Sequence, residues 1–237
     1  MHQDNPARID PTSLQRSVPA ATGDQHLSAE LHVRWIAAGE NLGDVQRLRR
    51  DVYFHEQGGP YSDRSKRIAD GLDACGATLA IHKGADTIAT LRLHDFGPSA
   101  VQVEYGSLFQ IDHFAQSWPL DKVAVGTRFA VQADHRVKPV MDRLMEETYR
   151  RLLNIRMRFC LIACEPYLHD VFEYYGFHEY LPPAILPGGT GLLRMVLVME
   201  DSPHLLECGS PLYNLVNDAE SGAAAKAWLT RTFSHAG

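Results

Sequence analysis

The chain has 237 residues, enough for one large domain or two very small ones. With 45% hydrophobic and 22% charged residues it has the composition of a folded globular protein, which excludes disorder as its main state. No apolar run reaches the roughly 18 residues of a membrane-spanning helix. A formal net charge of −6 argues against a nucleic-acid-binding protein, because such proteins usually carry a basic excess.

The cysteines and histidines form no recognisable metal or disulfide pattern. There is no CxxC pair and no histidine pair at zinc-finger spacing; the four cysteines are Cys75, Cys160, Cys164 and Cys208. His169 and Glu173 stand at helical i, i+4 spacing, but no third ligand is apparent, so no metal site is expected. Reduced thiols and a first segment without the apolar stretch of a secretion signal predict a cytoplasmic protein.

The predicted elements begin after a polar first segment. Residues 1–28 are rich in Pro, Ser, Asp, Gln and Ala and are expected to form a flexible arm. Apolar residues alternate over 31–37, which predicts a strand. They recur at helical spacing over 42–52, which predicts a helix capped by Asn41. The glycine-containing, charged stretch 55–71 is expected to be a loop.

Two strands joined by a hairpin come next, followed by a less regular region. Residues 77–83 and 86–96 are typical of strands, with a short turn at 83–85. Residues 99–118 are mixed and predict only a short helical turn. Residues 121–132 form the most convincing strand of the chain, since apolar and β-branched residues dominate it.

The second half alternates helices and strands. Residues 140–155 have helical apolar spacing, and 159–164 is a continuous apolar run typical of a strand buried on both faces. Pro166 predicts the start of another helix and Gly176 its end. Residues 191–199 predict a last strand, which is followed by an alanine-rich helix.

This order of elements predicts a mixed α/β protein, with hairpins first and βαβ units later. The sequence contains no internal repeat. We expect one α/β domain at 29–203, preceded by the arm and followed by a C-terminal helical tail at 204–237.

Two of the predicted interior strands carry an arginine. Arg92 shares a strand face with apolar neighbours, and Arg128 shares one with small residues. A buried guanidinium costs free energy unless a carboxylate pairs with it, and the obvious partners are Asp70 and Asp73. Two interpretations stay open: a structural ion-pair network that ties the loop to the sheet, or a polar wall that binds an amine substrate.

Two further positions also allow two interpretations. Helix geometry places Arg49 at the edge of the apolar stripe, with Tyr53 one turn later on the same side. Arg49 either lays its stem along the core edge with its head in solvent, or belongs to a site. Gly126 in the middle of a strand either allows a bulge that frees backbone N–H groups, or permits close packing against a helix.

The stretch FEYYGFHE at 172–179 resembles the acetyltransferase superfamily called GNAT, in which a short aromatic helix ends in Gly-Phe between two late strands. Other stretches resemble the branch of that superfamily that takes acyl groups from acyl carrier protein. This branch includes the N-acyl amino acid synthases and the acyl-homoserine-lactone (autoinducer) synthases. The matching stretches, in chain order, are LRRDVY at 48–53, DGLD at 70–73, ATLRL at 89–93 and GTRFAV at 126–131.

The resemblance implies a GNAT-type acyl-CoA N-acyltransferase fold, a central twisted mixed sheet with helices on both faces. It implies transfer of a fatty acyl group from acyl carrier protein to the primary amine of an amino acid or peptide, by direct attack on the thioester. The donor is an acyl-phosphopantetheine thioester, with acyl-CoA as the alternative carrier, and no cofactor stays bound. Three alternatives are an autoinducer synthase using S-adenosylmethionine, an acyl-CoA-dependent transferase, and a non-catalytic sensor of acyl chains or amino acids.

The matching positions give the candidate site. The candidate catalytic residues are Arg128, Thr127 and Glu165, the last as a base just past the fifth strand or simply as a helix cap. The candidate substrate-binding residues are Arg49, Tyr53, Asp70, Asp73, Arg92, Phe109, Gly126 and Phe129. Cys160 and Cys164 are expected to be buried core thiols rather than nucleophiles.

Two departures from the family pattern and one basic segment bear on the identity of the substrates. Val125 stands where autoinducer synthases carry a glutamate, which argues against S-adenosylmethionine as acceptor. Pro139 and Met141 interrupt the loop whose backbone N–H groups hold the CoA pyrophosphate in other members. Basic residues crowd 136–158, where they form either a solvated helix face or a docking surface for an acidic carrier protein.

Overall fold

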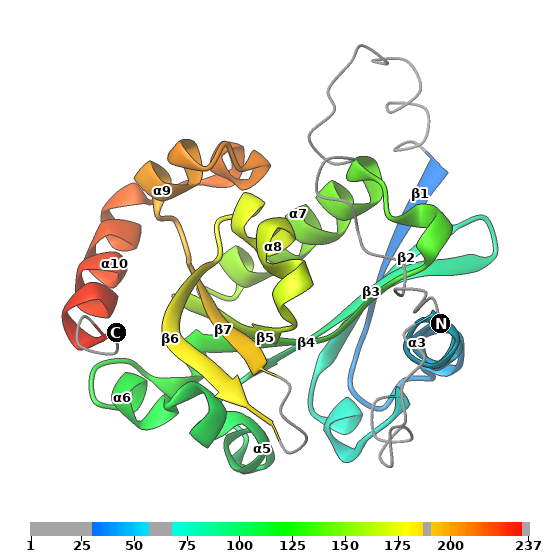
Figure 1. Ribbon diagram of the computed structural model, residues 1–237, viewed down its shortest axis with the longest axis horizontal. Helices are drawn as coiled ribbons and strands as arrows, with labels where there is room; N and C mark the ends of the chain where they lie inside the picture. Colours follow the sequence, from blue (N-terminus) through cyan, green and yellow to red (C-terminus); the bar gives the residue numbers. More distant parts are fainter. Residues whose placement is uncertain (1–29, 57–67, 187–190, 234–237) are drawn as a thin grey trace, which may run out of the picture. The chain divides into compact units, whose positions relative to one another are not determined.

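The computed structural model describes residues 30–56, 68–186 and 191–233 (Figure 1). The predicted arm at 1–28 and most of the predicted loop at 55–71 lie outside these residues. Among the described helices, none combines the length and the apolar character needed to cross a bilayer.

Helices flank a mixed sheet in which the strands of the described chain are hydrogen-bonded in the order β1-β2-β3-β4-β5-β7-β6. The pair β4–β5 is parallel, whereas β1–β2, β2–β3, β5–β7 and β6–β7 are antiparallel. The strands are β1 (Leu31–Ile36), β2 (Ala77–Lys83), β3 (Asp86–Asp95), β4 (Val123–Val131), β5 (Phe159–Cys164), β6 (His178–Ile185) and β7 (Gly191–Val198). The predicted mixed α/β class is confirmed, and every predicted strand is present.

The helices confirm most of the pattern and correct one part of it. They are α3 (Gly43–Arg50), α5 (Ser99–Phe109), α6 (Ile111–Ala115), α7 (Lys138–Asn154), α8 (His169–Tyr174), α9 (Ser202–Glu207) and α10 (Ala219–Phe233). The prediction of only one helical turn within 99–118 is wrong, since α5 and α6 occupy most of that stretch. The pattern is obscured because Val103 is 84% exposed and Gly106 is buried.

Two compact units divide the chain. The first comprises Met1–Leu93 and Arg128–Leu144, and the second comprises His94–Thr127 and Met145–Gly237. This division does not test the predicted limits at 29–203 and 204–237, which stay predictions.

In the first unit, α3 supplies the apolar face that the sequence predicts. Val45 of α3 and Leu42 pack in one buried cluster with Ile36 and Ala80, and a second cluster contains Leu48 with Val52 and Ala130. At the start of the helix, the side-chain oxygen of Asn41 accepts a hydrogen bond from the Gly43 N–H at 2.8 Å. Asn41 thus satisfies one N–H of the first turn, but its predicted N-cap position is wrong, because Leu42 occupies that position and makes no side-chain cap hydrogen bond.

In the second unit, β5 is the central buried strand, pairing with β4 on one side and β7 on the other. Gly176 ends α8 with φ +92°, the left-handed conformation expected of a helix C-cap glycine. Helix α10 packs in the same unit, where Trp228 contacts the rings of Phe114 and Phe159 at centroid distances of 5.1 and 5.4 Å. Gly222 of α10 approaches the Glu200 backbone so closely that a Cβ would overlap it.

Candidate active site

Two aspartates are fixed by the short segment that precedes β2. Asp70 caps a 3-10 helix, Gly71–Ala74, and its Oδ1 accepts a hydrogen bond from the Leu72 N–H at 2.9 Å. The carboxylate of Asp73 in turn accepts from the Asp70 N–H at 3.4 Å, which completes a reciprocal capping box. The hydrogen bonds of this segment therefore hold both carboxylates side by side, independently of the arginines.

Arg92 of β3 binds both carboxylates from within the core. Its Nη1 donates to Asp70 Oδ1 at 2.6 Å and to Asp73 Oδ1 at 2.7 Å, and its Nη2 donates to Asp70 Oδ2 at 3.1 Å. The side chain is completely buried. The predicted pairing of this strand arginine with the two aspartates is confirmed, as the cost of burying an unpaired guanidinium requires.

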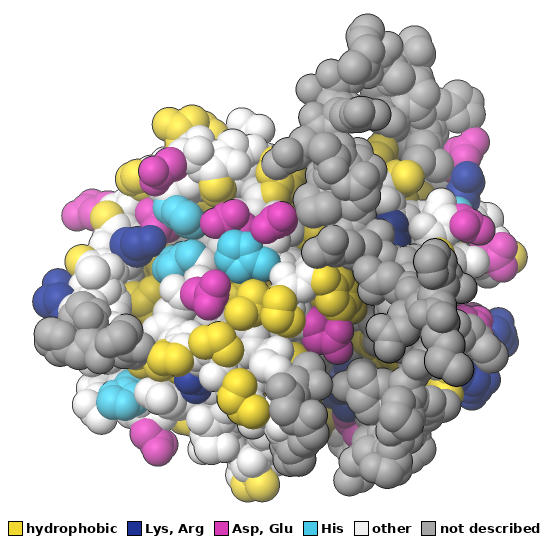
Figure 2. Space-filling model, in the orientation of Figure 1, with side chains coloured by type: hydrophobic (Ala, Val, Ile, Leu, Met, Phe, Trp, Pro, Cys, Tyr) yellow, Lys and Arg dark blue, Asp and Glu magenta, His cyan; other side chains and the backbone are white. Residues whose placement is uncertain are grey.

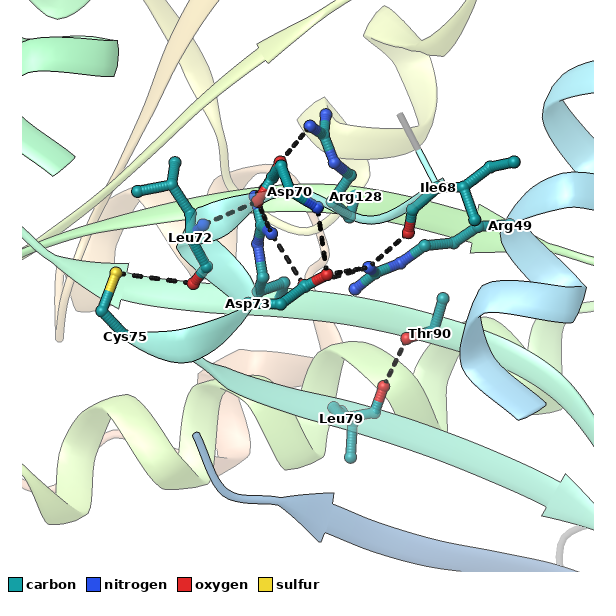
Figure 3. Close-up of polar contacts among 10 residues, drawn as sticks. Arg49, Ile68, Asp70, Leu72, Asp73, Cys75, Leu79, Thr90 and Arg128 are labelled. Carbon is teal, nitrogen blue, oxygen red and sulfur yellow. Dashed lines mark hydrogen bonds and ion pairs between the residues drawn. The ribbon is translucent and has the colours of Figure 1, made fainter. Parts of the chain in front are cut away.

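Arg49 of α3 binds one of these two aspartates, Asp73. Its Nη1 donates to Asp73 Oδ1 at 3.1 Å and to the Ile68 carbonyl oxygen at 3.0 Å (Figure 3). The interpretation that its head lies in solvent is wrong, because the side chain is 0% exposed. Burial lowers the pKa of Arg49, and the neighbouring Asp73 charge counteracts this effect.

Arg128 of β4 completes the set through a hydrogen bond from Nη2 to Asp70 Oδ2. Unlike the other two arginines, it is partly accessible, with 19% of its side chain exposed. Its φ of 55° is left-handed, which is unusual for a non-glycine residue within a strand. The left-handed residue of β4 is thus Arg128, and both interpretations of Gly126, a bulge or close packing, stay predictions.

These five side chains form the arginine–aspartate cluster: Arg49, Asp70, Asp73, Arg92 and Arg128. Burial alone would raise the pKa of Asp70, but the hydrogen bonds and charges of Arg92 and Arg128 outweigh it and lower the pKa to about 2. Burial opposes the charged form of Arg92, yet the two aspartates raise its pKa overall. Asp70 is therefore an anion at neutral pH, and the cluster formally carries three positive and two negative charges.

Tyr53 and Phe129 lie in the same unit as the cluster. The Tyr53 hydroxyl, on a π-helix at Asp51–Glu56, donates to the Phe129 carbonyl oxygen at 2.8 Å. This bond ties the segment after α3 to the strand residue that follows Arg128. The first unit thus contains seven of the predicted site residues: Arg49, Tyr53, Asp70, Asp73, Arg92, Arg128 and Phe129.

The remaining predicted site residues belong to the second unit. Gly126 and Thr127 directly precede Arg128 in β4. Phe109 is buried, packs edge-on against Phe96 at a centroid distance of 6.4 Å, and accepts a hydrogen bond from the Tyr180 hydroxyl through its carbonyl. These contacts give Phe109 a core position, and its role in substrate binding stays a prediction.

Glu165 stands at the N-cap of the 3-10 helix Pro166–Leu168, just past β5. Its side chain makes no capping hydrogen bond, and its carbonyl oxygen accepts the Leu168 N–H at 2.9 Å. The alternative in which its carboxylate caps the helix is therefore wrong. Its role as a base stays a prediction.

The thiols of β5 are core groups. Burial raises the pKa of Cys160 and of Cys164 to about 12 in each case. A nucleophilic cysteine needs a lowered pKa, because the thiolate is the reactive form. The prediction of buried core thiols is confirmed, and all four cysteines are free of disulfides.

The first turn of α7 falls in the stretch that the sequence analysis compares with the pyrophosphate loop of CoA-dependent GNAT enzymes. The N–H groups of Val140 and Met141 both donate to the Val137 carbonyl, at 3.1 and 3.2 Å. Met141 is 4% exposed, so its side chain belongs to the core. These two amides are engaged within the chain.

Two features of the cluster escaped the sequence analysis. The Ile68 carbonyl accepts from Arg49, and a backbone acceptor leaves no mark in the residue types. The left-handed conformation falls on Arg128, whereas sequence reasoning assigns such a conformation to glycine.

No model of a protein family matches the chain, and no curated protein matches it. Solved structures do. FeeM, an N-acyl amino acid synthase from uncultured soil microbes, superposes with a TM-score of 0.58 at 12% identity, covering 79% of this chain and 98% of its own. An acyl-CoA N-acyltransferase from Pseudomonas aeruginosa gives 0.53 at 18% identity, covering 71% and 99%. The chain has the acyl-CoA N-acyltransferase, or GNAT, fold.

A further GNAT-fold neighbour is BjaI, a CoA-dependent acyl-homoserine lactone synthase, with a TM-score of 0.57 at 18% identity. The alignment covers 83% of this chain and 99% of BjaI. The GNAT resemblance that the motifs indicate is therefore confirmed at the level of the fold.

Proposed function

We propose that the protein is an N-acyltransferase that moves a fatty acyl group from acyl carrier protein to the primary amine of an amino acid or peptide. One observation carries this proposal. Arg128 is partly exposed and held by Asp70, and it directly follows Gly126 and Thr127 in β4. The proposed contact for the amine substrate, the Arg128 side chain, therefore directly follows in sequence the backbone proposed to contact the thioester, that of Gly126 and Thr127.

The arginine–aspartate cluster suits a zwitterionic acceptor. The side chains of Asp70 and Asp73 are 15% and 12% exposed, so each carboxylate presents a little surface to a substrate ammonium. Arg128 presents its guanidinium to a substrate carboxylate, for which bidentate pairing is favourable. An α-amino acid, which carries both charges two bonds apart, matches this arrangement.

The chemistry needs a neutral amine. Its nitrogen attacks the thioester carbonyl carbon, the C–N bond forms, the C–S bond breaks, and the departing thiolate takes up a proton. Asp70, with its pKa of about 2, orients the ammonium but is too weak a base to deprotonate it. Glu165 or an ordered water is the proposed base, and Thr127 with the β4 backbone is assigned to the developing oxyanion.

A covalent acyl-enzyme is not part of the proposal. The high pKa values of Cys160 and Cys164, about 12 in each case, keep both thiols protonated and unreactive at neutral pH. Direct attack by the amine is the simpler route.

Acyl carrier protein is the proposed donor for two reasons. The amides of Val140 and Met141 already bond within the chain, which leaves them unsuited to a CoA pyrophosphate, and phosphopantetheine has only one phosphate. The segment 136–158 also exposes basic side chains that suit an acidic partner, namely Lys138, Arg150 and Arg156. Acyl-CoA is the alternative, since BjaI is CoA-dependent.

An autoinducer synthase is the second candidate, favoured by the structural likeness to BjaI, which has been solved with S-adenosylmethionine. Val125 opposes it. This residue is 0% exposed in β4 and stands where those synthases carry a glutamate. The two candidates differ in product, because acyl transfer to S-adenosylmethionine with lactone formation releases methylthioadenosine.

The test is a turnover assay. The protein is mixed with acyl carrier protein loaded with chains of several lengths, together with pooled amino acids and short peptides. The carrier is followed by intact mass and the products by mass spectrometry. We expect loss of the acyl group and a matching N-acyl product, strongly reduced in Arg128→Ala. Arg34→Ala, which removes an exposed arginine on β1, is the matched control and should keep full activity.

Each alternative outcome has a distinct meaning. Equal rates with acyl-CoA and acyl carrier protein would contradict the donor. Methylthioadenosine release from S-adenosylmethionine would establish the autoinducer reaction. Absence of thioester turnover with every donor and acceptor would overturn the catalytic proposal in favour of a sensor of acyl chains or amino acids.

A further inference from the structure

A second group of titratable side chains lies on α8 and on β6, in the second unit. It consists of His169, Asp170, Glu173 and Glu179, which we call the histidine–carboxylate group. One ligand atom each from His169, Asp170 and Glu173 lies within 4.8 Å of the other two. The His169–Glu173 spacing is visible in the sequence, and the structure supplies the third side chain.

The distances suit one shared ion. His169 Nδ1 and Asp170 Oδ1 lie 3.1 Å apart, joined by a hydrogen bond that a bound ion would replace. Nitrogen and oxygen ligands bind a transition metal at about 2.0–2.2 Å, so two ligands of one ion stand roughly 3–4 Å apart. His169 faces the carboxylate at a separation in that range, and Glu173 is within reach of both.

The other ring nitrogen of His169 has its own carboxylate. Its Nε2 lies 3.5 Å from Glu179 Oε1, which comes from β6 rather than from α8. In metal sites, a ligating histidine usually directs its second N–H to a carboxylate or carbonyl, which fixes the tautomer and the ring orientation. Glu179 is placed to do this when Nδ1 takes the ion.

The charge balance also indicates a cation. Asp170, Glu173 and Glu179 lie near one imidazole, and among the described residues none of the three forms an ion pair with a lysine or arginine. Like charges at such distances repel each other. Figure 2 shows acidic and histidine side chains gathered on one face of the molecule, in the region where Figure 1 draws α8 and α9.

We propose that this group binds one divalent transition-metal ion. His169 Nδ1, Asp170 and Glu173 are the ligands, Glu179 orients the imidazole, and water fills the remaining positions. One imidazole with two carboxylates suits zinc or manganese better than calcium or magnesium, which prefer oxygen ligands alone. The side chains of His169 and Asp170 are 30% and 60% exposed, so the ion can enter from solvent.

The test is calorimetric titration of the full chain, purified without a histidine tag and freed of metal by a chelator, with zinc chloride as probe. We expect one zinc ion per chain, loss of this binding in His169→Gln and in Glu173→Gln, and affinity roughly 10–100-fold lower in Glu179→Gln. His32→Gln, which removes an exposed histidine on β1, should bind as the wild type does. Circular dichroism checks that every variant is folded.

A second readout uses cobalt in place of zinc. Binding through one nitrogen and several oxygens should alter the weak visible bands of aqueous cobalt, and this difference spectrum should be absent in Glu173→Gln. The proposal is overturned if the wild type takes up no stoichiometric zinc at millimolar concentration. It is also overturned if the folded His169→Gln and Glu173→Gln variants bind zinc as tightly as the wild type.

Discussion

The arginine–aspartate cluster and the histidine–carboxylate group are both clusters of charged or titratable side chains, yet they satisfy their charges in different ways. In the first, Arg49 and Arg92 are completely buried and each carboxylate accepts hydrogen bonds from arginine. In the second, the carboxylates are largely exposed and their only described ion-pair partner is His169. Carboxylates that are paired with buried arginines are held in a fixed geometry, whereas carboxylates without a lysine or arginine partner are available to an external cation.

Breaking the arginine–aspartate cluster should have the largest effect. Arg92→Ala leaves Asp70 and Asp73 without their central buried partner, and loss of one member of a buried ion pair costs about 3–5 kcal/mol. Urea unfolding measures the loss. Arg34→Ala is the control, because its pair with Glu40 is about half exposed and such pairs contribute about 0–1 kcal/mol. A loss below 1 kcal/mol in Arg92→Ala would contradict the structural role of the cluster.

Acid should release part of the same stabilisation. The pKa of Asp70 is about 2 in the folded protein against 3.8 for the free side chain, so its contribution is complete above pH 4 and is lost as the pH falls toward 2. The difference corresponds to about 2 kcal/mol. Urea unfolding between pH 7 and pH 2 should show this loss in the wild type. Asp70→Asn should be less stable at pH 7 and show a correspondingly smaller loss, and identical pH profiles would contradict the assignment.

Two substitutions of Arg128 separate the effect of its backbone conformation on stability from the effect of its charge. Both Arg128→Ala and Arg128→Gly remove the ion pair with Asp70, but only glycine adopts a φ of 55° without strain. We expect the glycine variant to be more stable than the alanine variant by about 1 kcal/mol in urea unfolding. Both should lose acyl transfer. An alanine variant as stable as the glycine variant would show that the left-handed conformation relaxes at little cost.

One strand and two of the ion pairs could be predicted from the sequence on physical grounds. The continuous apolar run at 159–164 fixes β5 with its observed bounds, since such a run needs burial on both faces. The pairing of Arg92 and Arg128 with Asp70 followed from the cost of a buried unpaired charge. Local patterning and elementary electrostatics were sufficient in both cases.

Other parts depend on contacts between distant segments. Helix geometry placed Arg49 only at the edge of an apolar stripe, and its complete burial depends on Asp73, which lies 24 residues later. The third side chain of the histidine–carboxylate group, Asp170, was adjacent to His169 in the sequence. The sequence pattern does not single it out, because neighbouring helical residues usually point apart.

The smallest effect is expected in the histidine–carboxylate group without metal. Glu173 is exposed and has no described ion-pair partner, so Glu173→Gln should change the free energy of unfolding by less than about 0.5 kcal/mol in the presence of a chelator. Any change should be stabilising, because it removes one of three like charges. With saturating zinc, the wild type should gain thermal stability and the variant should not, since only an ion bound to the folded state stabilises it. Equal zinc effects on the two proteins would place the ion elsewhere, and a large loss without metal would make Glu173 a structural residue like Asp70.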